Sequence, residues 1–252
     1  MLIDAHCHIN SLDEAKQKDI LRSSQNEYIF IDVSIDLTTT IDSLTVLGDY
    51  EFVYHSLGFH PLSGGNFSSQ TIERYRNFIR SYKKIVAIGE IGLDYKSSLS
   101  FKEQKDILEA FINLSKEFDL PVVIHNRWND DGILGILDEY FSDYTNIIFH
   151  CFSQDISFLR RIIDRNGNVS FSLNVLRNKS RLKEALKYAP LDRLLLETDS
   201  PYMKVYGDYS TPFDIKKVYN YAAKIKNVSF EELKQKVYCN AHRLFSFKKV
   251  NR

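Results

Sequence analysis

The chain has 252 residues, of which 44% are apolar and 26% are charged, and its 33 basic side chains balance 33 acidic ones. This composition is typical of a globular protein and excludes the disordered and fibrous classes. Zero net charge argues against non-specific coating of duplex DNA, because such binding needs many cationic contacts to phosphates.

Eight short runs rich in β-branched and aromatic residues predict β-strands, and a polar or glycine-bearing loop follows each run. They lie at residues 1–5, 28–33, 52–57, 85–88, 122–124, 146–149, 169–172 and 194–196. Apolar residues at a spacing of three and four between these runs, and after the last one, predict helices. The helical segments are residues 72–82, 101–118, 132–141, 156–163, 181–188, 211–226 and 229–245.

Alternation of strand and helix through eight units predicts a parallel sheet that closes into a (β/α)8 TIM-type barrel of the α/β class. An open doubly wound sheet is the alternative, and it usually carries a glycine-rich turn after the first strand. Here that turn reads His6-Cys7-His8, and no G-x-G-x-x-G motif occurs. We find no linker or low-complexity tract, so we expect a single domain over residues 1–252.

Six residues able to bind a metal ion fall at or just past the carboxyl ends of predicted strands, where the active site of a parallel barrel lies. They are His6, His8, Glu90, His125, His150 and Asp199. His6 and His8 are two apart on extended chain, so their side chains point the same way, whereas Cys7 points toward the helices as a small core residue. A lone histidine after a strand is more often a hydrogen-bonded core residue, so the prediction depends on the whole ordered set.

The number of donors indicates more than one metal ion. Four imidazoles and two carboxylates exceed what one tetrahedral ion uses. We therefore expect a metal centre of two divalent ions, Zn²⁺, Mn²⁺ or Mg²⁺, about 3.5–4 Å apart and bridged by a carboxylate and a water. Our assignment gives His6, His8 and Asp199 to one ion, His125 and His150 to the other, and Glu90 to both as the bridge.

Six short motifs follow one another along the chain. They are Asp4-Ala5-His6-Cys7-His8, Gly58-Phe59-His60-Pro61, Gly89-Glu90-Ile91-Gly92-Leu93-Asp94, Pro121-Val122-Val123-Ile124-His125, His150-Cys151-Phe152-Ser153 and Glu197-Thr198-Asp199-Ser200-Pro201-Tyr202. In this order they resemble the TatD family, metal-dependent deoxyribonucleases of the amidohydrolase superfamily, and residues 240–245 resemble that family's closing helix. The resemblance covers nearly the whole chain.

The resemblance implies a TIM-type barrel whose divalent-metal centre hydrolyses phosphodiester bonds, often from the end of a DNA strand. It also implies metal ligands at the six positions assigned above. The chain departs from the family pattern after Tyr202, where many members carry an Arg followed by Asn-Glu-Pro and residues 205–212 read Val-Tyr-Gly-Asp-Tyr-Ser-Thr-Pro. It also has Asn174 where a glycine is common. Both departures fall on the predicted substrate rim.

Three residues are candidates for catalysis: Asp199, Glu90 and His60. Asp199 is the best candidate to accept the proton of the attacking water, because a ligand carboxylate lies within reach of it; a role as ligand only is the alternative. His60 lies in an uncharged loop after the third strand, and we interpret it as a donor to a phosphate oxygen rather than a ligand. Its alternative role is a hydrogen bond within the loop.

Basic and aromatic side chains near these positions are candidates for substrate binding. Arg127 could hold a phosphate or fix Glu90 from behind, and Asp94 more plausibly orients its neighbours than reacts. Arg177 and Lys179 follow the seventh strand and could contact a nucleic-acid backbone, although a solvated helix face explains them equally well. The aromatic candidates for stacking on unpaired bases are Trp128, Phe152 and Tyr202, with core packing as the alternative.

We therefore expect a metal-dependent phosphodiesterase that acts as a monomer, a deoxyribonuclease on DNA ends or single strands. One alternative is an amidohydrolase-type enzyme that acts on a small ester, lactone or amide. Such enzymes often bridge two metals with a carboxylated lysine; here Glu90 ends the fourth strand, and Lys83 and Lys84 precede it, which favours the TatD type. A non-catalytic binding protein is the other alternative.

The same features predict a cytoplasmic protein with no membrane partner. The amino terminus reads Met-Leu-Ile-Asp-Ala-His and has no basic region typical of a signal peptide. The longest stretch without Asp, Glu, Lys or Arg, residues 52–72, is rich in Ser, Gly, His and Asn and could not span a bilayer. Three cysteines are too few, and odd in number, for a secreted disulfide scaffold.

Overall fold

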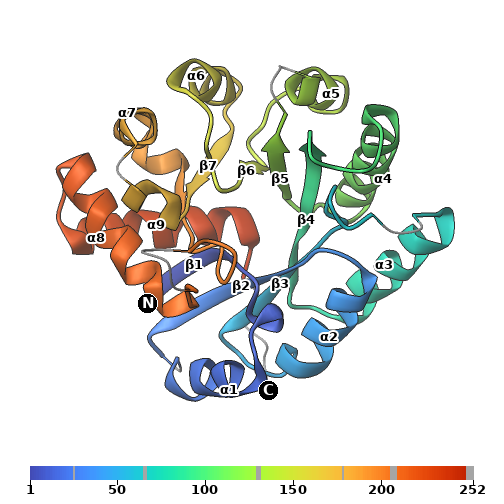
Figure 1. Ribbon diagram of the computed structural model, residues 1–252, viewed down its shortest axis with the longest axis horizontal. Coiled ribbons are helices and arrows are strands. Elements are labelled where there is room, and N and C mark those ends of the chain that lie inside the picture. The colour runs from blue at the N-terminus through green and yellow to red at the C-terminus, as the bar shows by residue number, and fades with distance from the viewer. Residues whose placement is uncertain (25, 65–66, 129–131, 178, 205–208, 248–252) are drawn as a thin grey trace.

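The structure is a computed structural model that describes the chain apart from residues 25, 65–66, 129–131, 178, 205–208 and 248–252. Eight parallel strands lie at the centre with helices around them, and each strand pairs with the next one in chain order (Figure 1). The strands are β1 (Leu2–Cys7), β2 (Tyr28–Ser34), β3 (Val53–Leu57), β4 (Ile85–Asp94), β5 (Val122–Arg127), β6 (Ile147–Phe149), β7 (Asn168–Phe171) and β8 (Leu194–Leu196). The predicted TIM-type barrel is confirmed.

Nine α-helices cover the strands in the described part of the chain. They are α1 (Glu14–Ser23), α2 (Leu37–Leu47), α3 (Ser69–Ser81), α4 (Phe101–Phe118), α5 (Gly132–Tyr140), α6 (Ile156–Asp164), α7 (Ser180–Tyr188), α8 (Ile215–Lys226) and α9 (Phe230–Phe245). The last seven lie where the sequence pattern predicts helices. None of the described helices is long and apolar enough to cross a membrane.

Helices α1 and α2 were missed at the sequence level because their apolar signal is weak. Among the residues of α1 only Ile20 and Leu21 are buried, and α2 contains a run of β-branched threonines, which favours strands as much as helices. Both helices begin at an aspartate whose carboxylate accepts a backbone N–H of the first turn, which stabilises a helix start. The two aspartates are Asp13 and Asp36.

The core lies between the strands and the helix layer. Helix α4 illustrates it: Ile107, Leu108, Phe111 and Ile112 are buried, and the helix packs against β4. Burying each such side chain contributes about 1.5–3 kcal/mol. Cys7 is fully buried in a second apolar cluster that includes residues of α1, as predicted for a side chain that points toward the helices.

A side chain closes the barrel between β8 and β1, a pair for which no strand pairing is present among the described residues. The buried carboxylate of Asp4 accepts the Thr198 backbone N–H at 2.8 Å and the Thr198 hydroxyl at 2.6 Å. Two backbone bonds continue the seam, from Asp199 N to His6 O at 3.0 Å and from His8 N to Ser200 O at 2.8 Å. The ends of β1 and β8 are therefore held side by side.

Strand β4 extends to Asp94, six residues past its predicted end, and two glycines let it approach β5 closely. Gly92 has a φ of 152°, and a Cβ there would lie 1.8 Å from the His125 carbonyl oxygen. A Cβ on Gly89 would lie 2.4 Å from the Val123 carbonyl oxygen. Because no side chain stands between the two backbones, Glu90 is carried directly against β5.

We expect Gly92→Ala to lower the free energy of unfolding by more than about 2 kcal/mol, because its Cβ would overlap the β5 backbone. The matched control is Gly135→Ala in α5, where a Cβ would meet no atom within 4 Å. That change should raise stability by about 0.5–1 kcal/mol, since alanine favours helix. Urea denaturation followed by circular dichroism measures both; equal midpoints for Gly92→Ala and wild type would contradict the packing described.

Candidate metal centre

The six predicted metal donors meet at the carboxyl ends of the strands, and all six are buried. His6, Glu90 and His125 lie within β1, β4 and β5, and His8, His150 and Asp199 follow β1, β6 and β8, so the donors come from parts of the chain far apart in the sequence. Their donor atoms form two groups within 4.8 Å, one of His6, His8 and Asp199 and one of His6, Glu90 and His150. A third group joins Glu90 and His125 with His60.

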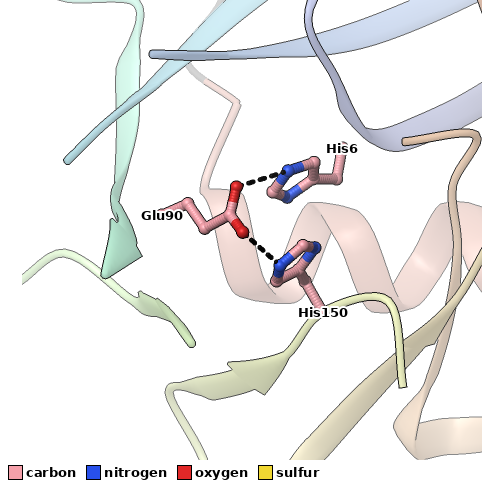
Figure 2. Close-up of side chains that lie close together, drawn as sticks. All are labelled: His6, Glu90 and His150. Atoms are coloured by element: carbon pink, nitrogen blue, oxygen red, sulfur yellow. Dashed lines mark ion pairs between the residues drawn. The ribbon is translucent and has the colours of Figure 1, made fainter. Parts of the chain in front are cut away.

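Glu90 lies at the centre of the donors, and its two carboxylate oxygens face different halves of the set. Figure 2 shows one oxygen toward His6 and the other toward His150. Oε2 lies 3.3 Å from His6 Nε2 and 3.9 Å from His8 Nε2. Oε1 lies 2.6 Å from both His125 Nδ1 and His150 Nε2. One oxygen toward each group is the geometry that a bridging carboxylate requires.

Hydrogen bonds behind the imidazoles orient their free nitrogens toward the centre. His8 Nδ1 donates to the Val33 carbonyl at 2.8 Å, so its Nε2 keeps a lone pair, which faces Asp199 at 3.5 Å. His125 Nε2 donates to Asp94 at 2.9 Å, so its Nδ1, which is hydrogen-bonded to Glu90 at 2.6 Å, is the nitrogen that would give up its proton to bind a metal. Bonds of this kind fix the tautomer of a metal-binding histidine, and Asp94 orients its neighbour as predicted.

Among the described residues, no lysine or arginine forms an ion pair with the two carboxylates of the centre, and this makes the centre fit a metal ion. In the described part of the chain, Glu90 and Asp199 form ion pairs with histidines only. The Nε2 atoms of His6 and His8 are 3.2 Å apart, so both nitrogens point into the same small space. Imidazole and carboxylate together suit divalent transition metals.

Protons supply the positive charge when no ion is bound. Burial lowers the pKa of His150, but the negative charges of Glu90 and Glu197 outweigh burial and raise that pKa to about 10. Burial raises the pKa of Glu90, yet the positive charge of His150 outweighs burial and holds that pKa well below its usual range. At neutral pH the metal-free centre therefore contains an ionised Glu90 beside a protonated His150.

His60 lines the cavity above the centre and presents a proton to it. The Leu62 backbone N–H donates to His60 Nδ1 at 3.0 Å, so the proton of the neutral ring sits on Nε2. That atom lies 3.3 Å from Glu90 Oε1 and 3.2 Å from His125 Nδ1. A nitrogen that carries a proton has no lone pair for a metal, so this tautomer supports a donor role although the distances would also allow a ligand.

The predicted substrate-binding residues divide into two sets. Arg127 lines the cavity of about 570 Å³ at the centre, and its Nη1 donates to the Ser153 hydroxyl at 2.5 Å. Since Ser153 lies in the loop that carries His150, Arg127 holds that loop instead of contacting Glu90. Arg177 and Lys179 are exposed and are absent from the described residues that line the cavity; Arg177 donates to the Lys204 carbonyl at 3.1 Å.

The three predicted aromatic residues also have different surroundings. Phe152 is buried in the core, and Trp128 packs against Phe101 with ring centroids 5.4 Å apart. Tyr202 is exposed and lines the cavity. In the altered segment after it, residues 205–208 lie outside the described residues, and Asn174 is buried in a short 3-10 helix (Leu173–Arg177).

Two carboxylates that support the centre were missed at the sequence level. Glu197 is fully buried, accepts the Cys151 backbone N–H at 2.7 Å and lies 3.5 Å from His150 Nδ1. Asp4 forms the seam described above and accepts the His6 backbone N–H at 3.3 Å. Strand alternation was the available signal, because Asp4 precedes His6 by two residues and Glu197 precedes Asp199 by two.

Comparisons with known proteins give the chain close relatives over its whole length. The family described as "TatD related DNase" matches residues 3–246. The "uncharacterized metal-dependent hydrolase YabD" of Bacillus subtilis is 31% identical, covering 97% of this chain and 99% of the relative. The metal-dependent hydrolase YcfH of Escherichia coli is 32% identical, covering 97% and 95%. The crystal structure of YjjV, a TatD homologue of Escherichia coli, has a TM-score of 0.87 at 25% identity, covering 97% of this chain and 98% of that one.

We expect a divalent ion to displace about one proton when it binds at pH 7, because His150, with a pKa of about 10, must be neutral to act as a ligand. The raised pKa keeps the proton on His150 at every pH below about 10. The affinity for the metal ion should therefore fall about tenfold for each unit by which the pH decreases.

Titration calorimetry in buffers of different ionisation enthalpy measures the released proton. His150→Ala should abolish the release, whereas His242→Ala, a histidine outside the centre, should keep it. A binding enthalpy that is the same in every buffer would contradict the charge state assigned to the metal-free centre.

Proposed function

The chain belongs to the TatD-related DNase family and is a metal-dependent hydrolase, and on that premise we propose that it is a deoxyribonuclease. It would hydrolyse phosphodiester bonds at the ends of DNA or in single strands, as a one-domain monomer with two divalent ions. The proposal rests on the position of Glu90 in the lining of an open cavity. Its Oε1 lies 2.6 Å from His150 Nε2, and its Oε2 lies 3.3 Å from His6 Nε2, so the two oxygens face separate groups of donors.

In the proposed centre, each half of the donor set would hold one ion. His6, His8 and Asp199 would hold the first, His125 and His150 would hold the second, and both ions would share Glu90. Zn²⁺, Mn²⁺ and Mg²⁺ are the candidate ions. When bound, such ions lower the pKa of a water and neutralise charge on a phosphoryl oxygen.

Asp199 is the proposed base. Water attacks phosphorus, Asp199 takes its proton, and the bond from phosphorus to the leaving ester oxygen breaks. Two contacts support this position: the carboxylate is buried 3.5 Å from His8 Nε2, and the backbone N–H of Asp199 bonds to the His6 carbonyl. The left-handed φ of 55° at Asp199 turns its carboxylate back toward β1.

His60 is the proposed donor to a non-bridging phosphate oxygen. Burial lowers its pKa, so the ring is neutral at pH 7 with its single proton on Nε2, facing the cavity. Arg127 adds positive charge to the cavity wall while it holds the loop after β6. Arg177 and Lys179, which lie outside the lining, would contact only the part of a strand that leaves the cavity.

An end-labelled oligonucleotide digest across Mg²⁺, Mn²⁺ and Zn²⁺ tests the proposed function. We expect shortened products from single strands with at least one of these ions, and none in excess chelator. Glu90→Ala should abolish product, because it removes the group shared by both halves. A panel of ester, lactone and amide substrates belongs to the same experiment. Turnover in that panel without cleavage of any strand would show a different hydrolase.

Asp199→Asn tests the base. We expect turnover to fall by about 10²–10⁴-fold, because an amide cannot accept the water's proton. The melting temperature should stay near that of wild type, since the amide fills the same space. Asp42→Asn, an exposed aspartate of α2, is the control and should keep full activity. A near-wild-type rate for Asp199→Asn would leave Asp199 with the role of ligand only.

A further inference from the structure

Three large apolar side chains that line the cavity at the metal centre are left exposed to solvent. The exposed fractions are 49% for Leu62, 56% for Tyr95 and 54% for Tyr202. A single exposed apolar side chain needs no explanation, but a group of them around one concave site marks a surface that a ligand covers.

Tyr202 stands beside the half of the centre that contains His8 and Asp199. Its ring meets the His8 ring edge to face, with centroids 4.8 Å apart. Its hydroxyl forms a hydrogen bond with the Ser11 hydroxyl at 3.1 Å. The ring is therefore held at both ends, and more than half of its surface remains open.

Tyr95 stands beside the other half of the centre. It follows Asp94, the residue whose carboxylate orients His125. The turn around it is held by two bonds to Asp94, from Lys96 N at 2.8 Å and from Ser97 N at 3.1 Å. A third bond joins Asp94 N to Gln104 at 2.9 Å. The backbone of Tyr95 is thus tied to the metal centre, while its ring, with the Lys96 ammonium 5.9 Å from its centroid, leaves more than half of the side chain exposed to a ligand.

The order of strands places these two rings across the mouth of the barrel from each other. Tyr95 follows β4 and Tyr202 follows β8, and three strands, β5, β6 and β7, lie between these two in the sheet. Glu90 lies between the two halves. A phosphodiester likewise joins two nucleosides, one on each side of phosphorus, so a phosphate above Glu90 would direct one base toward each tyrosine.

We propose that Tyr95 and Tyr202 are the stacking surfaces for the two bases that flank the scissile phosphodiester. This inference rests on the proposed function and specifies its substrate: a single strand or a frayed end, whose bases are free to leave their neighbours. Bases inside a duplex are paired and already stacked on each other, so an aromatic side chain gains access only where they are splayed. Since every base has a π-face, stacking on these rings would not distinguish one DNA sequence from another.

Steady-state kinetics of the full chain with Mn²⁺ and a short single strand test the inference. Tyr95→Ala and Tyr202→Ala should each raise KM by about 5–150-fold, which corresponds to the loss of one base-aromatic stack. The value of kcat should change little, because stacking on a base away from phosphorus is the same in ground and transition state. Phenylalanine at either position keeps a ring and should keep most of the affinity.

Tyr82→Ala is the matched control, because Tyr82 is 41% exposed and lies before β4, at the opposite end of that strand. It should leave KM unchanged. Binding provides a second readout: fluorescence anisotropy of a labelled strand on the Glu90→Gln background, which does not turn over, should show the same weakening for each Tyr→Ala change.

A strand with abasic units in place of the two nucleosides at the scissile bond completes the test. Wild type should lose on this strand the product of the two factors that the single alanine variants lose on the normal one, and the double variant Tyr95→Ala/Tyr202→Ala should lose nothing further. A further loss by the double variant on the abasic strand, a KM unaffected by either tyrosine, or tighter binding to blunt duplex than to single strand would each overturn the inference while leaving the nuclease proposal in place. Cleavage of neither strand by wild type with any of the ions would overturn both.

Discussion

A buried carboxylate whose ion-pair partners, in the part of the chain that the structure describes, are all histidines is the constraint on which this structure depends. Glu90 lies within 3.3 Å of nitrogens from His6, His60, His125 and His150, and those rings come from four different parts of the barrel. Removing such a charge from water is costly unless a positive charge replaces the lost solvation. Protons on histidine serve this purpose in the metal-free protein, and divalent ions suit the same donors better.

The rest of the barrel is arranged so that these donors can meet. Gly89 and Gly92 remove the side chains that would hold β4 away from β5, which allows Glu90 to reach His125. On the other side, Asp4 joins β1 to the loop after β8, which brings His6 and His8 to Asp199. These groups are not members of the donor set. They set the distances between its members, and such supporting contacts matter as much to a metal site as its ligands.

The mouth of the cavity combines a charged floor with an apolar rim. The floor holds the carboxylates and imidazoles, whereas Leu62, Tyr95, Tyr202 and Met203 contribute apolar surface to the wall. A phosphodiester flanked by two bases has the matching distribution, with its charge at the centre and its apolar surface on both sides. In the proposed function, the polar groups at the bottom of the cavity carry out the chemistry, and the apolar groups around its mouth contact the two bases.

By itself the sequence determined the architecture and the members of the donor set. The period of two in the strands and of three to four in the helices gave the order of elements, and position at strand ends picked out all six donors, because parallel strands in a barrel end on one side. Helices α1 and α2 escaped this reasoning, since few of their residues are buried and the threonines of α2 suit strands equally well.

Only the tertiary structure decided how these groups face one another. Which oxygen of Glu90 faces which histidine, the proton on His60 Nε2, and the contacts of Asp4 and Glu197 all depend on distances of a few ångströms between strands far apart in sequence. Such distances exist only once the barrel has closed. The separate places of Arg127 at the centre and Arg177 outside it have the same origin, because a sequence records the order of side chains and not their separation in space.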